Sequence, residues 1–314
     1  MIKKRIVIVV FLVVTVLLAG CSLDLSDSSG TRPIVNTVVN ETKNDTANDT
    51  ENNTTETDKV TEAPKNELPT IEEQLCFTYE GLTVTAKSFT NDDFWGAGIK
   101  LLVENNSDKD LSIGCEAVIV NDYMLFDLFG CEVAAGKKSN ETLYLSSDQL
   151  SAAGIDHIGK IEIYFYVYDS ETYDTLFAAD CVTLKTSLFD VMDCEPNDDG
   201  AELYNKDGIR IVGKYVDEDS FWGTSVLLYV ENHSGKNITV SCDDLSVNGF
   251  MIEGYLSTMV YQGKMAMDTI TLLSDELEAN DIDSVDSIEL KFRIYDSDTY
   301  DTIVETDPIT FEVK

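Results

Sequence analysis

The stretch 161–175 reads IEIYFYVYDSETYDT, and it occurs a second time at 288–302 as IELKFRIYDSDTYDT. In the first copy the apolar residues are separated by single residues, and they are Ile161, Ile163, Phe165 and Val167. An apolar period of two is typical of a β-strand with one buried face. The stretch therefore predicts a half-buried strand followed by an acidic turn, written twice in the same chain.

The repetition extends well beyond this strand. Residues 81–184 match residues 208–311 at a constant offset of 127 positions, and we count about 39 identities over about 105 positions. Because the repeats of a solenoid are about 20 to 50 residues long, a repeat of this length indicates two copies of a whole domain. We expect a first domain at 74–186 and a second at 201–314, joined by a short acidic linker at 187–200.

Each copy contains about seven strand-like segments. Asn248-Gly249 supplies the positive φ angles of a two-residue hairpin, and Asn121-Asp122 holds the same place in the first copy. A short helical turn is expected at 148–153. Antiparallel strands without βαβ alternation favour an all-β fold with two tandem immunoglobulin-like β-sandwich domains. The strands expected in the first copy are 82–89, 97–105, 111–120, 123–133, 142–146, 159–169 and 175–185.

The N-terminus has the composition of an export signal. Residues 1–20 combine three early basic residues, an apolar run and small residues near the end, which is the pattern of a signal peptide. The alternative is an uncleaved membrane anchor. Leu18-Ala19-Gly20-Cys21 resembles the lipobox of bacterial lipoproteins. That resemblance implies that Cys21 carries a diacylglyceryl group with acyl chains such as palmitate. It also implies a protein anchored to the cell membrane and facing the extracellular side.

Residues 21–73 contain no aromatic residue and are rich in Thr, Asn, Asp and Glu. A segment of this composition cannot bury enough apolar surface to offset the entropy lost on ordering. We therefore expect a disordered stalk that separates the folded domains from the membrane.

The chain carries 22 Lys and Arg against 58 Asp and Glu, a formal net charge of -36. This excess argues against partners recognised through their phosphates, so nucleic acid is not expected as a ligand. Anionic lipid headgroups should also repel the folded part and help to hold it away from the membrane.

Several turn and strand signals resemble one family. The segments at 104–110 and 231–237 read ENNSDKD and ENHSGKN, and each is followed by a strand, an Asn-containing turn and a Gly-Lys step. This pattern resembles the telokin-like, immunoglobulin-like domains of unknown function in Gram-positive surface lipoproteins. The resemblance covers both copies. It implies β-sandwiches and brings no catalytic residues.

Enzymatic activity is not expected. His157 aligns with Ser284 and His233 with Asn106, so neither histidine occurs in both copies. The sequence contains no nucleophile elbow, zincin helix or phosphate-binding loop. We expect non-catalytic binding or adhesion to a surface protein or glycan. The alternative is a structural or accessory envelope protein with no ligand of its own.

Calcium is a possible ligand of the acidic turns that follow the repeated strand. Ca²⁺ takes six to eight oxygen ligands, and the turns place carboxylates close together. The spacing does not match an EF-hand, and acidic turns are more often solvated surface. The candidate calcium ligands are Asp169, Glu171, Asp174, Asp296, Asp298 and Asp301.

Two tryptophans are candidates for a ligand platform. Trp95 and Trp222 occupy equivalent positions before a predicted strand, and their rings could stack on a sugar. The favoured alternative is that both plug the sandwich cores.

Six cysteines follow Cys21, and an exported protein permits disulfides. Cys115 could pair with Cys131 on neighbouring strands, and Cys76 could pair with Cys181 across the domain edge. Sequence alone does not fix this connectivity. Because the chain contains no Cys-x-x-Cys pair, a thiolate metal site is not expected.

Overall fold

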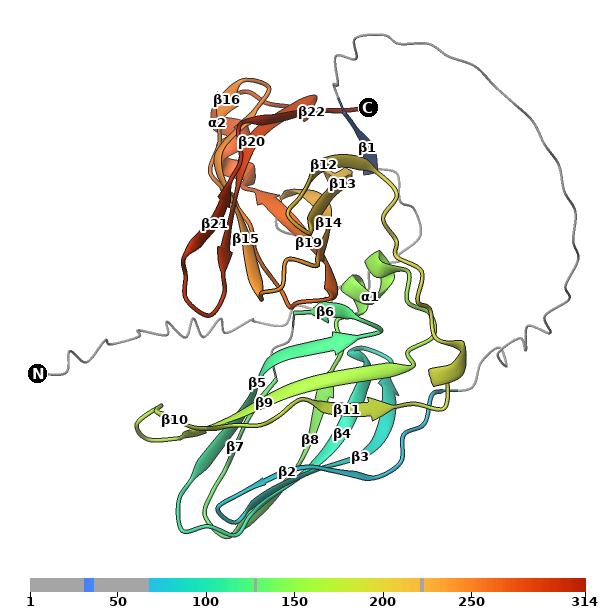
Figure 1. Cartoon of the computed structure of the whole chain (residues 1–314), viewed down its shortest axis with the longest axis vertical. Helices are drawn as coiled ribbons and strands as arrows, with labels where there is room; N and C mark the ends of the chain where they lie inside the picture. Colours follow the sequence, from blue (N-terminus) through green and yellow to red (C-terminus); the bar gives the residue numbers. More distant parts are fainter. Residues whose placement is uncertain (1–30, 37–67, 127–128, 221–222) are drawn as a thin grey trace, which may run out of the picture.

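A computed structural model of the chain describes residues 31–36, 68–126, 129–220 and 223–314. They form two β-sandwiches that are stacked end to end along the long axis of the molecule (Figure 1). The all-β fold and the duplication predicted from the sequence are confirmed. In the described residues no helix is long and apolar enough to cross a membrane.

The N-terminal sandwich has two sheets. In the first, consecutive strands β2, β3 and β4 lie side by side and β8 pairs with β4; in the second, β5 and β9 form the centre. The first sheet contains β2 (Gln74–Tyr79), β3 (Leu82–Asp92), β4 (Gly96–Asn105) and β8 (Lys137–Tyr144). The second contains β5 (Leu111–Val120), β6 (Tyr123–Leu125), β7 (Gly130–Val133), β9 (Lys160–Asp169), β10 (Thr175–Ala178) and β11 (Val182–Lys185), and α1 (Ser147–Ala153) follows β8.

The C-terminal sandwich repeats this arrangement. Its first sheet contains β12 (Ala201–Lys206), β13 (Ile209–Asp217), β14 (Thr224–Asn232), β17 (Gly254–Tyr255) and β19 (Lys264–Leu272). The second contains β15 (Ile238–Val247), β16 (Phe250–Met251), β18 (Ser257–Val260), β20 (Ser287–Asp296), β21 (Thr302–Glu305) and β22 (Ile309–Val313). Helix α2 (Ser274–Ala279) matches α1, and the 3₁₀ turn η1 (Phe189–Val191) lies in the linker.

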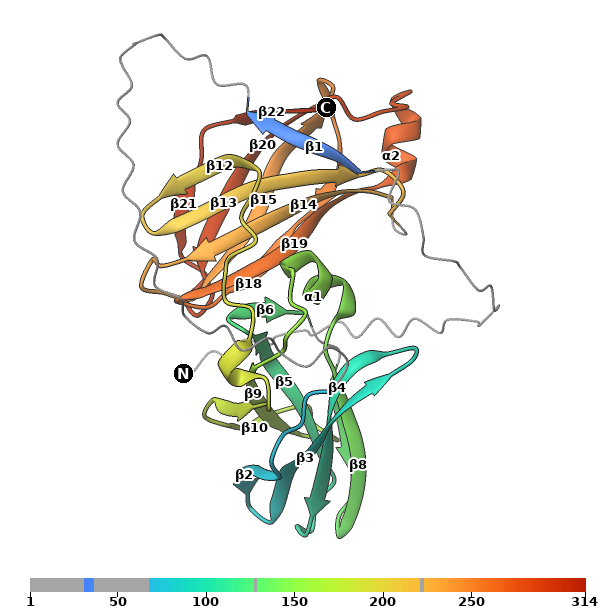
Figure 2. The ribbon, with the colours of Figure 1, turned by 90° about the vertical axis from the view of Figure 1, so that its right-hand side faces the viewer.

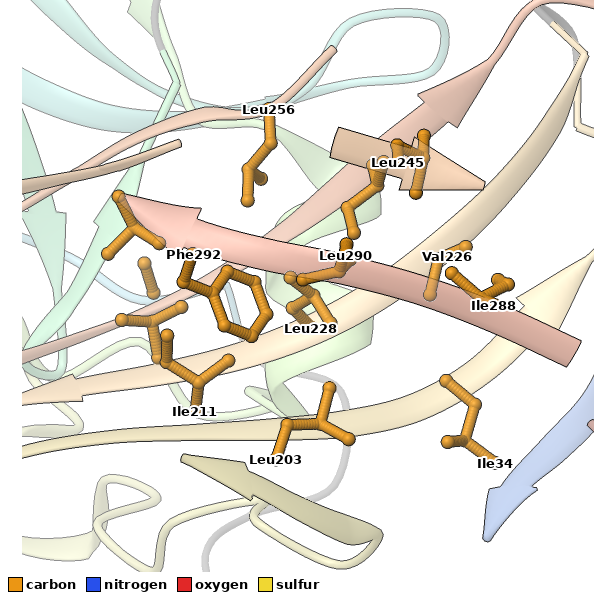
Figure 3. Close-up of a cluster of buried hydrophobic side chains, with 14 of the residues drawn as sticks. Ile34, Leu203, Ile211, Val226, Leu228, Leu245, Leu256, Ile288, Leu290 and Phe292 are labelled. Atoms are coloured by element: carbon orange, nitrogen blue, oxygen red, sulfur yellow. The ribbon is translucent and has the colours of Figure 1, made fainter. Parts of the chain in front are cut away.

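The repeated strand behaves as its alternation predicts. Ile161, Ile163, Phe165 and Val167 on β9 are all buried, and so are their equivalents on β20. Phe292 lies at the centre of the C-terminal core, surrounded by aliphatic side chains from both sheets (Figure 3). The two hairpins predicted at Asn121 and Asn248 are also confirmed, because both residues have positive φ.

Strand β2 was missed by the sequence analysis. Its burial alternates poorly, since Phe77 is its only buried residue, so the strand gives a weak periodic signal. Two strands that were predicted as continuous, 123–133 and 175–185, are each broken into two shorter ones.

The two sandwiches are joined by backbone pairing as well as by side chains. Strand β6 runs parallel to β19, with Tyr123 opposite Met265 and Met124 opposite Ala266. Apolar side chains cross the joint, because Tyr229 of the second sandwich packs into the core of the first. Gln149 on α1 donates from its side-chain nitrogen to the carbonyl oxygen of Met267, at 3.1 Å. The joint is therefore a continuous interface rather than a loose linker.

A charged cluster covers one side of this joint. The Lys264 ammonium lies 2.6 Å from a carboxylate oxygen of Asp122 and 2.5 Å from one of Glu162, and Lys160 bonds Asp122 at 2.7 Å. Burial alone pushes the pKa of Asp122 upward, but the hydrogen bonds from Lys160 and Lys264 outweigh it, so the pKa is lowered. Burial likewise opposes the charge on Lys264, yet its two carboxylate partners raise its pKa.

The first prediction concerns the pH dependence of this cluster. A carboxyl group with a lowered folded pKa contributes stability above its unfolded pKa and loses it as pH falls through the folded value. We expect Asp122→Asn to reduce stability by roughly 1 kcal/mol at neutral pH, because Asn tolerates the positive φ but loses the ion pairs. The deficit should shrink below about pH 3.8, and melting curves of both proteins across pH would measure it. A constant deficit across the acid range would contradict this assignment.

The structure corrects the expectation of a wholly disordered stalk at 21–73. Thr31–Asn36 forms strand β1, which lies antiparallel to two strands of the C-terminal sandwich at once. Its first half pairs with β13 of one sheet, where Thr31 faces Asp217. Its second half pairs with β22 of the other sheet, where Ile34 faces Val313. Strand β1 thus joins the two sheets (Figure 2).

Side chains of β1 fix it firmly in place. Ile34 is 4% exposed and belongs to the C-terminal core (Figure 3). It packs over Gly213, where an added Cβ would lie only 3.0 Å from the Ile34 side chain. The Arg32 guanidinium lies 2.9 Å from a carboxylate oxygen of Glu218 and 2.9 Å from the carbonyl oxygen of Val285. More buried and more exposed side chains therefore alternate along this strand, but over too few residues to give a recognisable period in the sequence.

Comparison of the two sandwiches shows why β1 is needed. In the first sandwich Ile71, just before β2, pairs with Thr186 and packs on the core. Ile71 and Thr186 correspond, at the repeat offset of 127, to Asp198 and Val313. Asp198 instead forms an ion pair with Arg210, so the linker does not reach Val313. Ile34 of β1 takes the position opposite Val313.

The second prediction tests this role. We expect Ile34→Ala to reduce the stability of the C-terminal sandwich by about 2 kcal/mol or more, with a fall in Tm of roughly 8 °C or more. Val35→Ala is the matched control, since the side chain of Val35 is only half buried and should cost less. Calorimetry of the three proteins decides the matter. Equal losses in the two variants would mean that Ile34 does not fill the core.

Candidate functional site

An exposed aromatic cluster lies at the tip of the hairpin that joins β3 to β4. Phe94 is 77% exposed and Trp95 is 59% exposed. The favoured expectation, that Trp95 packs in the core of the first sandwich, is therefore wrong. Trp222, its equivalent in the second sandwich, lies outside the described residues.

The local sequence explains why the tip holds this shape. The Asp92 carboxylate accepts hydrogen bonds from the backbone N–H groups of Phe94 and Trp95, both at 2.9 Å. These bonds favour the ionised form and lower the pKa of Asp92. Gly96 follows with a φ of 76°, a conformation that most side chains disfavour. The turn residues Asp and Gly on either side of Phe-Trp were the signal that could have placed both rings at a tip.

The aromatic rings contact one another at this tip. Phe94 meets Trp95 edge to face, with ring centroids 4.9 Å apart and an interplanar angle of 85°. The ring of Trp95 also contacts that of Tyr144 on β8, with centroids 5.8 Å apart and an interplanar angle of 33°. We name Phe94, Trp95 and Tyr144 the aromatic tip. A supported but largely exposed indole can stack on a sugar ring or insert into an apolar groove of a partner.

A further exposed ring, that of Phe126, lies close to helix α1. The backbone N–H of Phe126, whose side chain is 67% exposed, donates to the side-chain oxygen of Gln149 on α1, at 2.6 Å. The aromatic tip approaches the start of α1 as well, because a Cβ at Gly96 would touch Ser147. Exposed aromatic residues thus gather around α1.

The acidic turns proposed for calcium are closed by their own backbone. The Asp169 carboxylate accepts from the N–H groups of Glu171 and Thr172, each at 3.0 Å. In the second sandwich Asp296 makes the equivalent bonds and also pairs with Lys236 at 2.8 Å. These bonds account for the repeated Tyr-Asp-Ser sequence without a metal ion.

The remaining carboxylates of the two turns do not converge. Among the described residues no group of three or more His, Cys, Asp or Glu side chains is placed to hold a metal ion. Calcium binding stays a prediction for all six candidate ligands, which are Asp169, Glu171, Asp174, Asp296, Asp298 and Asp301. The large aromatic residues exposed at these turns are Tyr173 and Tyr300, which stack on Tyr168 and Tyr295.

The six cysteines in the described part of the chain are present as thiols. Cys76 and Cys181 line one open pocket of about 250 Å³ between β2 and β11, which is consistent with their predicted proximity. Burial raises the pKa of Cys76 to about 11, so its thiol is protonated at neutral pH. Cys131 faces Ile113 across the sheet rather than Cys115. Both pairings stay predictions.

No protein-family model and no curated protein matches the chain. Two solved complexes are similar over 68% of the chain. One is the SafA pilin of Salmonella enterica in complex with the SafB chaperone, with 13% identity, a TM-score of 0.21 and 88% of that chain covered. The other is the CsuC–CsuE chaperone–tip adhesion subunit complex of Acinetobacter baumannii, with 10% identity, a TM-score of 0.20 and 90% covered. At these TM-scores neither likeness carries a functional argument.

The third prediction separates a binding role of Trp95 from a structural one. Because its ring is mostly exposed, Trp95→Ala should change the free energy of unfolding by less than about 0.5 kcal/mol. Phe165→Ala, at a buried position of the same sandwich, should cost about 3 to 5 kcal/mol. Chemical denaturation of both variants measures the difference. A loss of several kcal/mol in the free energy of unfolding of Trp95→Ala would mean that Trp95 packs in the core.

Proposed function

We propose that this chain is a non-catalytic, lipid-anchored surface protein that binds a glycan or surface-protein ligand through the aromatic tip of its N-terminal sandwich. The observation that carries the proposal is the exposure of Phe94 and Trp95 on a turn that Asp92 holds in one conformation. Ordered, exposed aromatic rings reduce the entropy lost on binding, and such residues are common at the centre of binding sites.

The position of β1 changes how such a protein would stand on a membrane. With a lipid on Cys21, nine residues separate the anchor from Thr31, and a chain of that length spans at most roughly 35 Å. Strand β1 is bound to the C-terminal sandwich. The C-terminal sandwich is therefore the one held near the membrane, and the N-terminal sandwich is carried on it. A stalk that lifts both domains freely is not compatible with this path.

The test of ligand binding is a glycan array probed with the chain from Ser22 to Lys314. Trp95→Ala should lose the signal, with at least about tenfold weaker binding. Tyr255→Ala is the matched control, because Tyr255 is 70% exposed but lies on the other sandwich. Retention of the signal by Trp95→Ala would contradict the assignment of the aromatic tip.

Lipid attachment is tested separately. Metabolic labelling with palmitate in a bacterial host should label the full-length chain, and Cys21→Ser should abolish the label. Cys194→Ser controls for acylation elsewhere, since Cys194 is exposed. Equal labelling of the Cys21→Ser protein would contradict the lipobox assignment.

A second candidate function is that of a rigid spacer without a ligand. The parallel pairing of β6 with β19 and the charged cluster around Lys264 favour it, because both fix the angle between the sandwiches. An accessory protein that holds a neighbouring envelope component at a set distance needs this rigidity. In that case neither the wild-type chain nor Trp95→Ala would give a signal on the glycan array.

A further inference from the structure

Strand β1 is held by the C-terminal sandwich but is not built into its chain. Thirty-one residues lie between Asn36 and Leu68, where the description of the N-terminal sandwich begins, and this length can span at most roughly 110 Å. Strand β1 also lies at the far end of the C-terminal sandwich, away from the N-terminal one (Figure 2).

The slot that receives β1 is formed by residues of the C-terminal sandwich. One wall is the end of β13 from Tyr215 to Asp217, and the other is the end of β22 from Phe311 to Val313. Glu218 lies at the rim, where it accepts from Arg32 and from the N–H of Val285. The backbone N–H of Lys314 donates to the carbonyl oxygen of Pro33 at 3.0 Å. An empty slot would leave such backbone groups without protein partners.

We infer that this slot is a strand-acceptor site for the Thr31–Asn36 segment of a second copy of the chain, so that two copies form a dimer by exchanging β1. The exchanged strand makes the same backbone pairs, the same Arg32 ion pair and the same Ile34 contact as the strand of its own chain. Exchange of an identical element therefore costs little beyond association itself.

The balance between the two arrangements is set by effective concentration. A tethered strand competes with a neighbouring one at an effective concentration in the millimolar range for a short tether, and lower when the tether must be stretched. The tether of 31 residues between Asn36 and Leu68 is long, which lowers the effective concentration of the strand of the same chain. Dilute protein is expected to be monomeric, and copies crowded together are expected to exchange.

A charge swap isolates exchange between copies. Arg32→Glu places an acid against Glu218 and Asp286, and Glu218→Arg places two guanidinium groups together, so each variant alone mismatches its own strand and that of its copies. In an equimolar mixture every strand finds a matched slot on the other variant. The double variant Arg32→Glu, Glu218→Arg restores matching within one chain and is the control.

The expected result, measured by analytical ultracentrifugation and native mass spectrometry on the Ser22–Lys314 chains, is a 1:1 heterodimer in the mixture. Each single variant and the double variant should be monomeric at the same micromolar concentration. A mixture that stays monomeric, while the double variant protects Thr31–Asn36 from hydrogen exchange, would overturn the proposal.

A second measurement does not depend on the charge swap. Ile34→Asp empties the slot by placing a carboxylate in the core, and a labelled peptide of residues 29–38 then serves as the probe. Saturable binding of this peptide to the Ile34→Asp chain supports strand acceptance from another molecule. A peptide that itself carries Ile34→Asp should not bind. The wild-type chain should bind the unchanged peptide at least about tenfold more weakly, because its slot is filled. No binding to the emptied slot would contradict it.

Discussion

The antiparallel pairing of Thr31–Asn36 with two strands of opposite sheets is the constraint on which the rest of the molecule depends. At the edges of the two sheets of a β-sandwich, backbone N–H and C=O groups lack strand partners unless another segment covers them. In the first sandwich the adjoining chain covers this edge, because Ile71, just before β2, pairs with Thr186. In the second sandwich the linker comes from the other domain and is tied there, where the N–H of Asn197 donates to the hydroxyl oxygen of Tyr123 at 2.8 Å. A distant segment has to supply the missing piece.

That single connection links local chemistry to the arrangement of the whole chain. Asn197, which holds the linker, also fixes the joint, because its side-chain nitrogen donates to the carbonyl oxygen of Ala152 on α1. The joint then aligns β6 with β19 and brings Lys264 to Asp122. The same geometry that makes the second sandwich incomplete thus makes the pair of sandwiches rigid. The aromatic tip is presented from a fixed frame, which is the property that a binding protein and a spacer share.

Much of the fold follows from the sequence because its signals are local or repeated. Alternation located β9 and β20, and Asn-Gly located a hairpin. The repeated Val-Glu-Asn sequence marks Asn105 and Asn232, each fully buried and donating to two backbone carbonyl oxygens across a loop. Strand β1 could not be recognised, because six residues with one core side chain give no periodic signal and their partners are about 180 to 280 residues away. The candidate site was only half foreseen for a related reason. Trp95 was named as a candidate platform residue, but whether an aromatic residue at a strand end points inward depends on the turn that Asp92 forms.

The most direct measurement is amide hydrogen exchange of the segment Thr31–Asn36 in the Ser22–Lys314 chain, resolved by mass spectrometry at near-neutral pH. If β1 completes the C-terminal sandwich, its amides exchange at least about tenfold more slowly than those of an unstructured peptide of the same sequence, and Ile34→Asp removes the protection. Exchange of Thr31–Asn36 at the rate of the free peptide, while β13 and β22 stay protected, would contradict the account.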